Sequence, residues 1–326
     1  MGIHQRITLL LISLWTTAAA CAGSLSAVSD FGANPGNLRL LVYEPATLAV
    51  PAPLVVALHG CQQGAADYDD ESGWTRFADR WGFLLLLPEQ ATANNTLRCF
   101  NWFRPGDTRR DQGEALSIRR MIAHVSARYP VDPQRLYVTG QSAGGAMTAA
   151  LLAAYPDLFA AGAIIAGVPY GCAISDFGAL WCQLWGWNLA PAEWGKRVRQ
   201  AAADNAVTVT RWPRVAIWQG SADSWVRPGN ATELMEQWTA VHGIDQQPEA
   251  EDTVSGYPHK TYADNAGNAL VETYWITGMG HGLPIHPDGG DDRCGVPGPY
   301  MLPAGICASY HIARFFGLDK PGSPPR

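Results

Sequence analysis

The sequence predicts an α/β fold in which a mostly parallel central sheet carries helices on both faces. Apolar runs typical of buried strands alternate with segments whose apolar residues recur at helical spacing. This alternation is typical of parallel sheets, because each strand is joined to the next through a helix. The 326 residues, 47% of them hydrophobic, are enough for one large α/β domain or two small ones.

Each element has its own signal. The strand run at 54–59 ends in Gly60, and the run at 83–87 is closed by Pro88. Between 113 and 129 the apolar residues recur every three or four positions, as in a helix with one buried face. In chain order, we predict strands at 38–43, 54–59, 83–87, 135–139, 161–166, 215–219 and 271–276, and helices at 73–81, 113–129, 143–154 and 310–316.

A G-x-S-x-G pentapeptide, Gly140 to Gly144, connects the predicted strand at 135–139 with a small-residue helix. A strand, this turn and a helix form the nucleophile elbow of α/β-hydrolases. Glycines flank the serine because side chains there would collide with the neighbouring strand and helix. The helix N-terminus directs N–H groups toward a developing oxyanion. The sequence therefore predicts an α/β-hydrolase with Ser142 as its nucleophile.

Two later loops supply the partners that a serine nucleophile needs, in the order Ser, Asp, His of α/β-hydrolases. Asp223 follows the predicted strand at 215–219, at the sheet edge where such sites form. His281 lies among glycines in the loop after the next strand. We expect His281 to transfer the proton of Ser142 and Asp223 to orient the imidazole. His286 is the weaker rival for the base.

An oxyanion hole needs two backbone donors. One is the residue after the nucleophile, Ala143, and the other comes from the loop after an early strand, which begins here at His59. We expect the Cys61 N–H to be this second donor, with Gln62 as the runner-up. We interpret His59 as a structural residue that braces the loop, rather than as a base.

The N-terminus is expected to be a signal peptide, residues 1–20, and not part of the fold. Arg6 supplies a positive charge, 7–15 is a short apolar stretch, and small residues precede position 21. This pattern predicts a secreted protein, extracellular or periplasmic. Cys21 leaves lipoprotein anchoring open, although Ala18 stands where a lipobox usually has leucine. No second long apolar segment follows, so we expect no stable membrane span.

The cysteine count agrees with export. Apart from Cys21, six cysteines remain, and six cysteines in an exported chain predict three disulfides. No two cysteines have C-x-x-C spacing and no histidines cluster with them, so metal binding has little support. Local spacing favours two short-range pairs, Cys172–Cys182 and Cys294–Cys307, and leaves Cys61–Cys99, among the many connectivities that six cysteines allow.

The net charge and the expected domain organisation of the chain limit the classes of function that fit it. A net charge of −6, without a basic run among aromatics, disfavours nucleic acid as a partner. We expect one catalytic domain over 24–326, with a cap-like excursion at about 169–202 that is rich in tryptophan, and no separate substrate-binding domain. Trp225, close to Asp223, and Trp102, on the loop of Cys99, are candidates to line the cleft, with core packing as the alternative for both.

Seven motifs are spread along the chain after the predicted signal: 59–63 (HGCQQ), 88–90 (PEQ), 99–102 (CFNW), 131–135 (VDPQR), 140–147 (GQSAGGAM), 167–173 (GVPYGCA) and 315–318 (FFGL). Together they resemble the polyhydroxybutyrate depolymerase family of esterases, which looks related to feruloyl and acetylxylan esterases. The resemblance covers nearly the whole chain after the signal and implies a secreted or periplasmic serine esterase without metal or organic cofactor. Many polymer-degrading members of this family carry a C-terminal substrate-binding domain, and we expect none here.

We therefore hypothesise an esterase that cleaves poly(3-hydroxybutyrate), its oligomers or a similar aliphatic polyester through an acyl-enzyme, and we expect a monomer. A feruloyl or acetylxylan esterase is the first rival, since only its acyl pocket would differ. A peptidase of the same fold is the second. The third is a non-catalytic binding protein on a hydrolase fold, which the complete set of Ser142, Asp223 and His281 disfavours.

Overall fold

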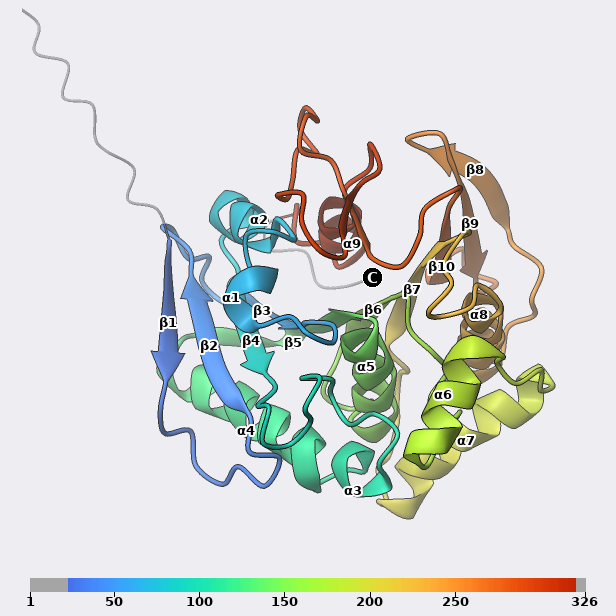
Figure 1. Cartoon of the computed structure of the whole chain (residues 1–326), viewed down its shortest axis with the longest axis horizontal. Coiled ribbons are helices and arrows are strands. Elements are labelled where there is room, and N and C mark those ends of the chain that lie inside the picture. Colours follow the sequence, from blue (N-terminus) through green and yellow to red (C-terminus); the bar gives the residue numbers. More distant parts are fainter. Residues whose placement is uncertain (1–22, 321–326) are drawn as a thin grey trace, which may run out of the picture.

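Ten strands form one continuous sheet through the centre of the structure. The computed structural model describes residues 23–320. The strand order is β1-β2-β4-β3-β5-β6-β7-β10-β9-β8, with the sheet crossing Figure 1 from left to right. The six neighbouring strands from β4 to β10 pair in parallel, and two antiparallel strands extend the sheet on each side. This arrangement confirms the predicted, mostly parallel sheet.

The parallel strands are apolar along most of their length because helices cover both of their faces. Alternate residues of β3 point to opposite sides: Leu54 and Val56 belong to one core, and Val55 belongs to the other. The parallel strands are β3 (Ala52–Leu58), β4 (Leu84–Glu89), β5 (Val131–Gln141), β6 (Ala161–Ile165), β7 (Arg214–Gly220) and β10 (Ala269–Ile276). The antiparallel strands are β1 (Ser24–Val28), β2 (Arg39–Glu44), β8 (Ala250–Val254) and β9 (Tyr257–Ala263), and a small separate sheet pairs β11 (Leu283–Ile285) with β12 (Met301–Pro303).

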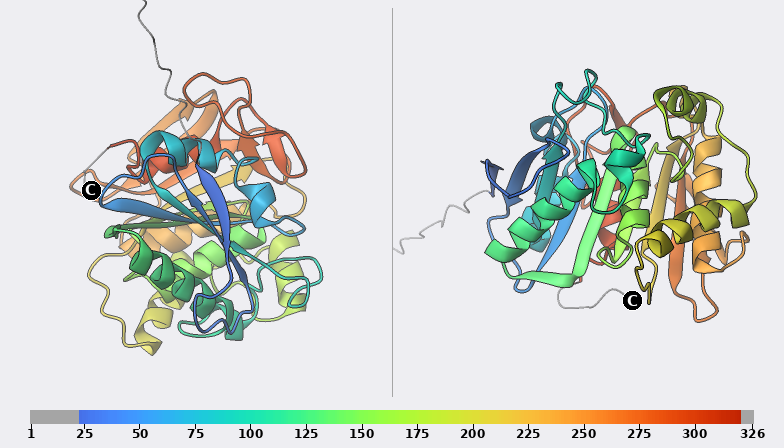
Figure 2. Two further views of the ribbon diagram at one scale, coloured as in Figure 1. Left: turned by 90° about the vertical axis from the view of Figure 1, so that its left-hand side faces the viewer. Right: turned by 90° about the horizontal axis from the view of Figure 1, so that it is seen from below.

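The helices form a layer on each face of the sheet (Figures 1 and 2). One layer lies below the sheet in Figure 1 and contains α3 (Pro105–Thr108), α4 (Gly113–Arg128), α5 (Ala143–Ala154), α7 (Pro191–Asp204) and α8 (Gly229–His242). The other layer contains α1 (Ala65–Tyr68), α2 (Trp74–Trp81) and α9 (Ala308–Phe315). A further helix, α6 (Asp176–Leu184), lies at the end of the sheet where the loops that follow β3 and β4 also lie (Figure 2, right).

Some of the elements absent from the sequence prediction have weak signals, and one has a clear signal. The edge strands β1 and β8 are largely exposed, so they lack the apolar run by which a buried strand is recognised. Helix α8, in contrast, has a readable signal, since Ala231, Leu234 and Trp238 recur at helical spacing and are buried. The strands and helices that were predicted are present, with ends shifted by a few residues.

The segment expected to form a cap-like excursion contains two helices with different surroundings. Helix α7 packs against α8 and α5 and so belongs to the layer below the sheet. Helix α6 lies outside that layer, near the ends of the parallel strands. The two helices therefore have separate roles in the fold, although the sequence presents them as one tryptophan-rich stretch.

Three disulfides join the six cysteines in the favoured pairs, Cys61–Cys99, Cys172–Cys182 and Cys294–Cys307. All six cysteines lie outside the parallel strands, and the segment closed by Cys61–Cys99 contains β4. Among residues 23–320, none of the helices combines the length and apolar character that crossing a membrane requires. The predicted signal peptide and Cys21 lie outside the described residues.

Helix α5 begins unusually close to the strands beneath it. A Cβ atom at Gly144 would overlap the carbonyl oxygens of Leu58 and His59, at the end of β3. A Cβ atom at Gly145 would lie 2.8 Å from the carbonyl oxygen of Ile165, at the end of β6. The first turn of α5 thus rests directly on the backbone of two strands, which is why the sequence has glycine at these positions.

We predict that Gly144→Ala lowers the free energy of unfolding by about 1–3 kcal/mol or more, because the added methyl group overlaps backbone atoms that cannot move aside. Denaturant unfolding followed by circular dichroism measures this change. Gly229→Ala is the matched control, since Gly229 begins α8 with open space around its Cα. Equal stability of the two variants would contradict the close approach of α5.

Candidate active site

Ser142 occupies a strained turn between β5 and α5. Its backbone has φ 57° and ψ −119°, values that a residue with a side chain rarely adopts. The Ser142 N–H donates to the carbonyl oxygen of Ile165 at 2.8 Å, which ties the turn to the neighbouring strand β6. The turn places the hydroxyl group at the N-terminus of α5, where the helix dipole favours negative charge.

The loops after β7 and β10 bring two further side chains to the serine. These strands are parallel neighbours, so both loops leave the same edge of the sheet. His281 Nε2 lies 2.9 Å from Ser142 Oγ, and His281 Nδ1 lies 2.7 Å from Asp223 Oδ2. The structure therefore joins the three residues singled out from the sequence in one hydrogen-bonded row.

Asp223 is buried and its carboxylate has a full set of partners. Oδ1 accepts from the backbone N–H groups of Trp225 and Val226, each at 2.9 Å. Oδ2 accepts from Gln219 Nε2 at 3.1 Å as well as bonding His281. Four bonds compensate for removing the charge from water and leave one carboxylate oxygen facing the imidazole. Gln219 was not foreseen, since nothing in the strand pattern of β7 marks it as a partner of Asp223.

The other two candidate histidines lie apart from this row. His286 Nδ1 bonds Asp292 Oδ2 at 2.9 Å, and within residues 23–320 no hydrogen bond joins His286 to Ser142. His59 is fully buried below the loop that begins at Gly60. Its Nδ1 bonds the Gly60 carbonyl oxygen at 2.7 Å, and its Nε2 accepts from the Gln90 N–H at 3.1 Å. Both ring nitrogens are therefore engaged in holding the chain, as the structural interpretation of His59 predicts.

The loop after β3 carries two candidate oxyanion donors, the N–H groups of Cys61 and Gln62, and one of them already has an acceptor. The Gln62 N–H donates to the carbonyl oxygen of Leu97 at 2.7 Å, so it is already occupied. Within residues 23–320, neither the Cys61 N–H nor the Ala143 N–H donates to another group. Gly60, Cys61 and Ser142 line the same cavity. The two expected oxyanion donors are therefore free, and the runner-up is not.

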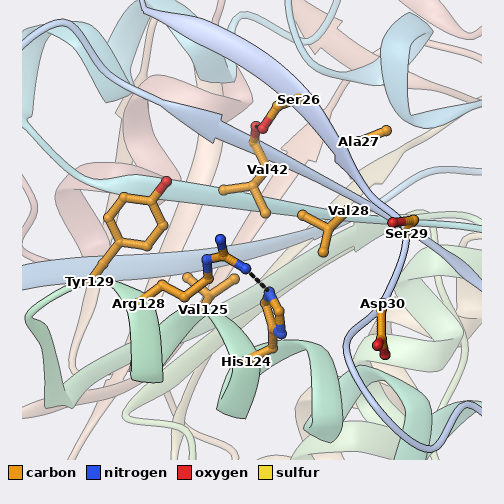
Figure 3. Close-up of a pocket in the computed structure, with 10 residues that line it drawn as sticks. All are labelled: Ser26, Ala27, Val28, Ser29, Asp30, Val42, His124, Val125, Arg128 and Tyr129. Carbon is orange, nitrogen blue, oxygen red and sulfur yellow. Dashed lines mark hydrogen bonds between the residues drawn. The ribbon is translucent and has the colours of Figure 1, made fainter.

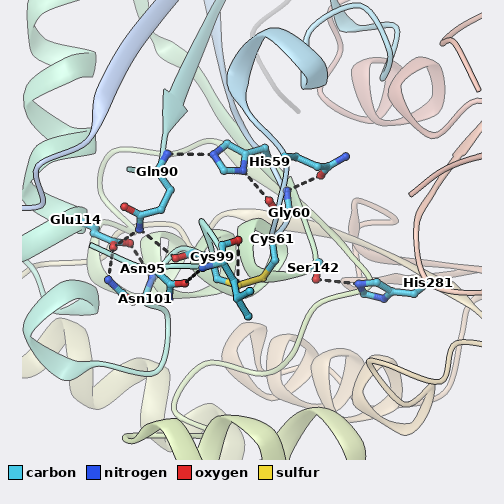
Figure 4. Close-up of a disulfide and its surroundings, with 12 residues drawn as sticks. His59, Gly60, Cys61, Gln90, Asn95, Cys99, Asn101, Glu114, Ser142 and His281 are labelled. Atoms are coloured by element: carbon cyan, nitrogen blue, oxygen red, sulfur yellow. Dashed lines mark hydrogen bonds between the residues drawn. A yellow bond between two sulfur atoms is a disulfide. The ribbon is translucent and has the colours of Figure 1, made fainter. Parts of the chain in front are cut away.

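A buried polar network supports this loop from behind (Figure 4). Gln90 connects this loop to the segment of Cys99, since its backbone N–H donates to His59 and its Nε2 donates to the Cys99 carbonyl oxygen at 3.1 Å. Cys99 is in turn joined to Cys61 by the disulfide. Glu114 Oε1 accepts from Gln90 Nε2 at 2.6 Å and from Asn101 Nδ2 at 2.7 Å. The loop is thus held by a covalent link and by side chains from α4 and from the segment between β4 and α4.

Burial perturbs the pKa of two groups in this network. It lowers the pKa of His59 to about 4, so this imidazole is neutral at physiological pH. It raises the pKa of Glu114 to about 8, an effect that the charge of Asp107 increases and that the N–H donors of Asn101 and Gln90 oppose. A neutral His59 suits its observed bonds, because one ring nitrogen donates and the other accepts.

A cavity of about 490 Å³ opens beside Ser142 and is lined in part by apolar side chains. Trp225 borders it with 64% of its surface exposed, as expected for a cleft residue. Trp102 does not line this cavity. It is 7% exposed, belongs to the core and lies edge-on to Phe103, which lines the cavity instead. The prediction for Trp102 therefore differs from the structure by one position on an irregular loop, where no periodicity indicates which side chain faces inward.

A second cavity, of about 520 Å³, lies at the β1 edge of the sheet, between β1, β2 and α4 (Figure 3). Its titratable lining groups include His124 and Arg128, whose side chains are 3.2 Å apart, and Asp30. No serine in this lining has a histidine partner among the bonds of the described residues. The arrangement needed for nucleophilic chemistry is found at the cavity of Ser142 and not here.

Comparison with known proteins agrees with the fold and the motifs. The chain is 27% identical to an acetyl xylan esterase from Aspergillus awamori, whose structure superposes with a TM-score of 0.75 over 91% of this chain and 100% of that one. Its fold is that of the α/β-hydrolases, as predicted. The family model described as esterase PHB depolymerase matches residues 38–253.

Curated relatives extend the match beyond the family model. The chain is 48% identical to poly(3-hydroxyalkanoate) depolymerase C of Paucimonas lemoignei over 90% of this chain and 70% of the relative. It is 35% identical to an acetylxylan esterase of Coprinopsis cinerea, over 81% of this chain and 70% of that protein. It is 32% identical to feruloyl esterase B of Talaromyces stipitatus, over 85% and 77%. The chain belongs to the PHB depolymerase family of esterases, which confirms the resemblance drawn from the motifs.

We predict that protonation of His59 contributes to the loss of stability at acidic pH. Its pKa of about 4 in the folded chain is below the value of about 6.5 in an unfolded one, so the unfolded chain binds the extra proton between these values. Stability is therefore lost as pH falls from about 6.5 toward 4. In His59→Gln this loss should be shallower by up to about 1.4 kcal/mol per pH unit.

The measurement is denaturant unfolding at pH 4.5, 5.5, 6.5 and 7.5. His242→Gln serves for comparison, because burial also lowers the pKa of His242 to about 4 in a part of the fold remote from the serine. We expect both variants to show shallower slopes. An unchanged slope in His59→Gln would show that His59 is not held neutral.

Proposed function

We propose that this protein is a serine esterase that hydrolyses carboxylic esters through an acyl-enzyme, with Ser142, His281 and Asp223 as its catalytic triad. The observation that carries the proposal is the hydrogen-bonded row from Ser142 Oγ through His281 to a buried, fully paired Asp223. The family to which the chain belongs supports the same activity.

In the proposed reaction, Ser142 Oγ attacks the ester carbonyl carbon while His281 Nε2 accepts the hydroxyl proton. The carbonyl oxygen becomes an oxyanion, for which the free N–H groups of Cys61 and Ala143 are suitable donors. The intermediate collapses, the alcohol leaves, and His281 returns the proton to the alcohol oxygen. Water then attacks the acyl group by the same route, which releases the acid and restores Ser142.

Asp223 stabilises the imidazolium that forms in each step. Its Oδ2 accepts from Nδ1, which keeps Nε2 directed at the serine. The bonds from Trp225, Val226 and Gln219 prevent the carboxylate from rotating away from the histidine. A fixed carboxylate favours the same imidazole orientation before and after proton transfer, which lowers the reorganisation that the reaction requires.

We propose a poly(3-hydroxyalkanoate), its oligomers or a similar aliphatic polyester as the substrate. The 48% identity to a poly(3-hydroxyalkanoate) depolymerase supports this choice. So does the cavity beside Ser142, where Leu97, Phe103 and Leu180 offer apolar contacts to an acyl chain. A feruloyl or acetylxylan esterase is the second candidate, supported by relatives at 32% and 35% identity.

We also propose that the protein is exported and that residues 24–326 act as one catalytic domain. Three disulfides support export, because such bonds persist in oxidising compartments. The sheet supports a single domain, since it runs without interruption from β1 to β8.

We predict that the wild-type protein clears a suspension of amorphous poly(3-hydroxybutyrate) with release of 3-hydroxybutyrate products, and that Ser142→Ala lowers the rate by about 10⁴-fold or more. Turbidity and product chromatography measure both. Methyl ferulate and acetylated xylan are tested alongside. Rapid ferulate or acetate release without clearing would keep the serine mechanism and favour the second candidate. Clearing retained in Ser142→Ala would contradict the mechanism.

A second prediction separates the two histidines. His281→Asn should lower kcat for a soluble ester such as p-nitrophenyl butyrate by about 10³-fold or more, because the proton of Ser142 loses its acceptor. His286→Asn is the matched control, since His286 also bonds an aspartate but lies away from Ser142. We expect it to retain kcat within about twofold. Loss of activity in both variants to the same extent would contradict the assignment of His281 as the base.

A further inference from the structure

Helix α6 carries apolar residues on two sides, and only one side faces the protein. Ala179 and Cys182 are buried and hold the helix to the fold. On the outer side, Phe177 is 75% exposed, Trp181 is 43% exposed, and Trp185, which ends the helix, is 68% exposed. Positions 177, 181 and 185 are one helical turn apart, so these side chains form one stripe. A surface helix normally has polar residues on this side.

The side chains of the outer stripe contact one another, and the helix that carries them is anchored to the fold. The ring of Trp181 lies 6.0 Å from that of Trp185 and 6.2 Å from that of Trp187, which gives a continuous aromatic cluster. The inner side is anchored by the Cys172–Cys182 disulfide and by Asn230 Nδ2, which donates to the Cys182 carbonyl oxygen at 3.1 Å. The rings therefore stay exposed, because the helix that carries them cannot turn to bury them.

The stripe is continuous with the cavity of Ser142. Leu180 lies between Phe177 and Trp181 along the helix and lines the cavity. Trp225, on the loop after β7, is also exposed and lines the same cavity. An extended apolar chain lying on α6 can thus pass over Leu180 into the cavity that contains the serine.

The charge of this region narrows the class of ligand. Between 171 and 190 the sequence contains one charged residue, Asp176, and no lysine or arginine. Asp176 lies 3.4 Å from Arg104 and is therefore paired. Helices that bind phospholipid surfaces carry lysine or arginine on their polar side. The α6 stripe lacks such residues, and its aromatic rings suit an uncharged, apolar solid.

We propose that the outer face of α6, formed by Phe177, Trp181 and Trp185, is the surface by which this protein adsorbs to a water-insoluble aliphatic polyester. The proposal rests on the polyester substrate proposed above. Adsorption places the cavity at the solid surface, so a polymer segment that detaches from the solid is close to Ser142. The surface acts on binding to the solid and leaves the chemistry of soluble esters unchanged.

The test uses the full chain with Ser142→Ala, so that adsorption is measured without turnover. Binding isotherms on poly(3-hydroxybutyrate) granules compare this protein with one that also carries Phe177→Gln and Trp185→Gln, the two most exposed members of the stripe. We expect the affinity to fall by about tenfold. A third substitution, Trp181→Gln, should lower it further. Thermal unfolding by circular dichroism verifies that each variant is folded.

The matched control is Val50→Gln, an apolar residue that is 76% exposed just before β3, at the opposite ends of the strands from the serine. It should adsorb as the parent does. In the active background, Phe177→Gln with Trp185→Gln should clear the polymer more slowly. Its kcat/KM for p-nitrophenyl butyrate should stay within about twofold of the parent value.

Equal adsorption of the stripe variant and its parent would overturn the proposal. So would an equal fall in kcat/KM for the soluble ester, which would place these residues in the catalytic cavity. A dimer that sedimentation velocity detects in the parent and not in the variant would assign the stripe to self-association, and binding to phosphatidylcholine vesicles lost in the variant would assign it to membranes. Failure of the polyester function is a separate result, because adsorption is measured in a protein that does not hydrolyse.

Discussion

The contact between the first turn of α5 and the backbone of β3 is the constraint on which the candidate site depends. Gly144 leaves no room for a side chain between the helix and the carbonyl oxygens of Leu58 and His59. This approach forces the chain to turn sharply between β5 and α5, and Ser142 takes a strained backbone conformation with positive φ as a result. The same contact brings the helix N-terminus next to the loop after β3, and Gly60 and Cys61 of that loop line the same cavity as Ser142.

The rest of the fold holds the other polar groups of the candidate site close to Ser142. Parallel pairing of β7 with β10 places the loops of Asp223 and His281 at one edge of the sheet. A buried carboxylate is unfavourable unless it is paired, and the two backbone donors beside Asp223 come from the tight turn of its own loop. The loop of Cys61 is supported differently, by a disulfide and by His59, whose neutral ring can donate to Gly60 and accept from Gln90 at once. Each part of the site is therefore held by bonds of a kind that its position in the fold makes available.

The sequence predicts most of this arrangement because the relevant residues follow strong local signals. Ser142, Asp223 and His281 each come directly after an apolar run, and the ends of parallel strands meet at one edge. Two of the cysteine pairs are close enough in sequence to be favoured by spacing, which leaves Cys61 and Cys99 as the third pair. Trp102 and Phe103 are different, because the irregular loop that carries them has no period from which to infer direction. The roles of Gln219 and Glu114 as buried hydrogen-bond partners are not predicted from the sequence. Such a partner is recognised only when the structure shows the group that it bonds.

Helix α6 shows how far a sequence pattern can be read without its surroundings. Apolar residues around a whole helix predict burial on all sides. The cap-like excursion is predicted from the tryptophans and the cysteine pair of this segment, which do not show which side of a helix is exposed. In the structure Ala179 and Cys182 take the buried side, and the disulfide and Asn230 fasten the helix there. The larger rings are left in water, where each exposed aromatic side chain is unfavourable by area and contributes nothing to the core. Exposed rings on a firmly anchored helix next to a hydrolase site are most simply explained by a ligand that covers them, and an apolar solid too large to enter the cavity is such a ligand.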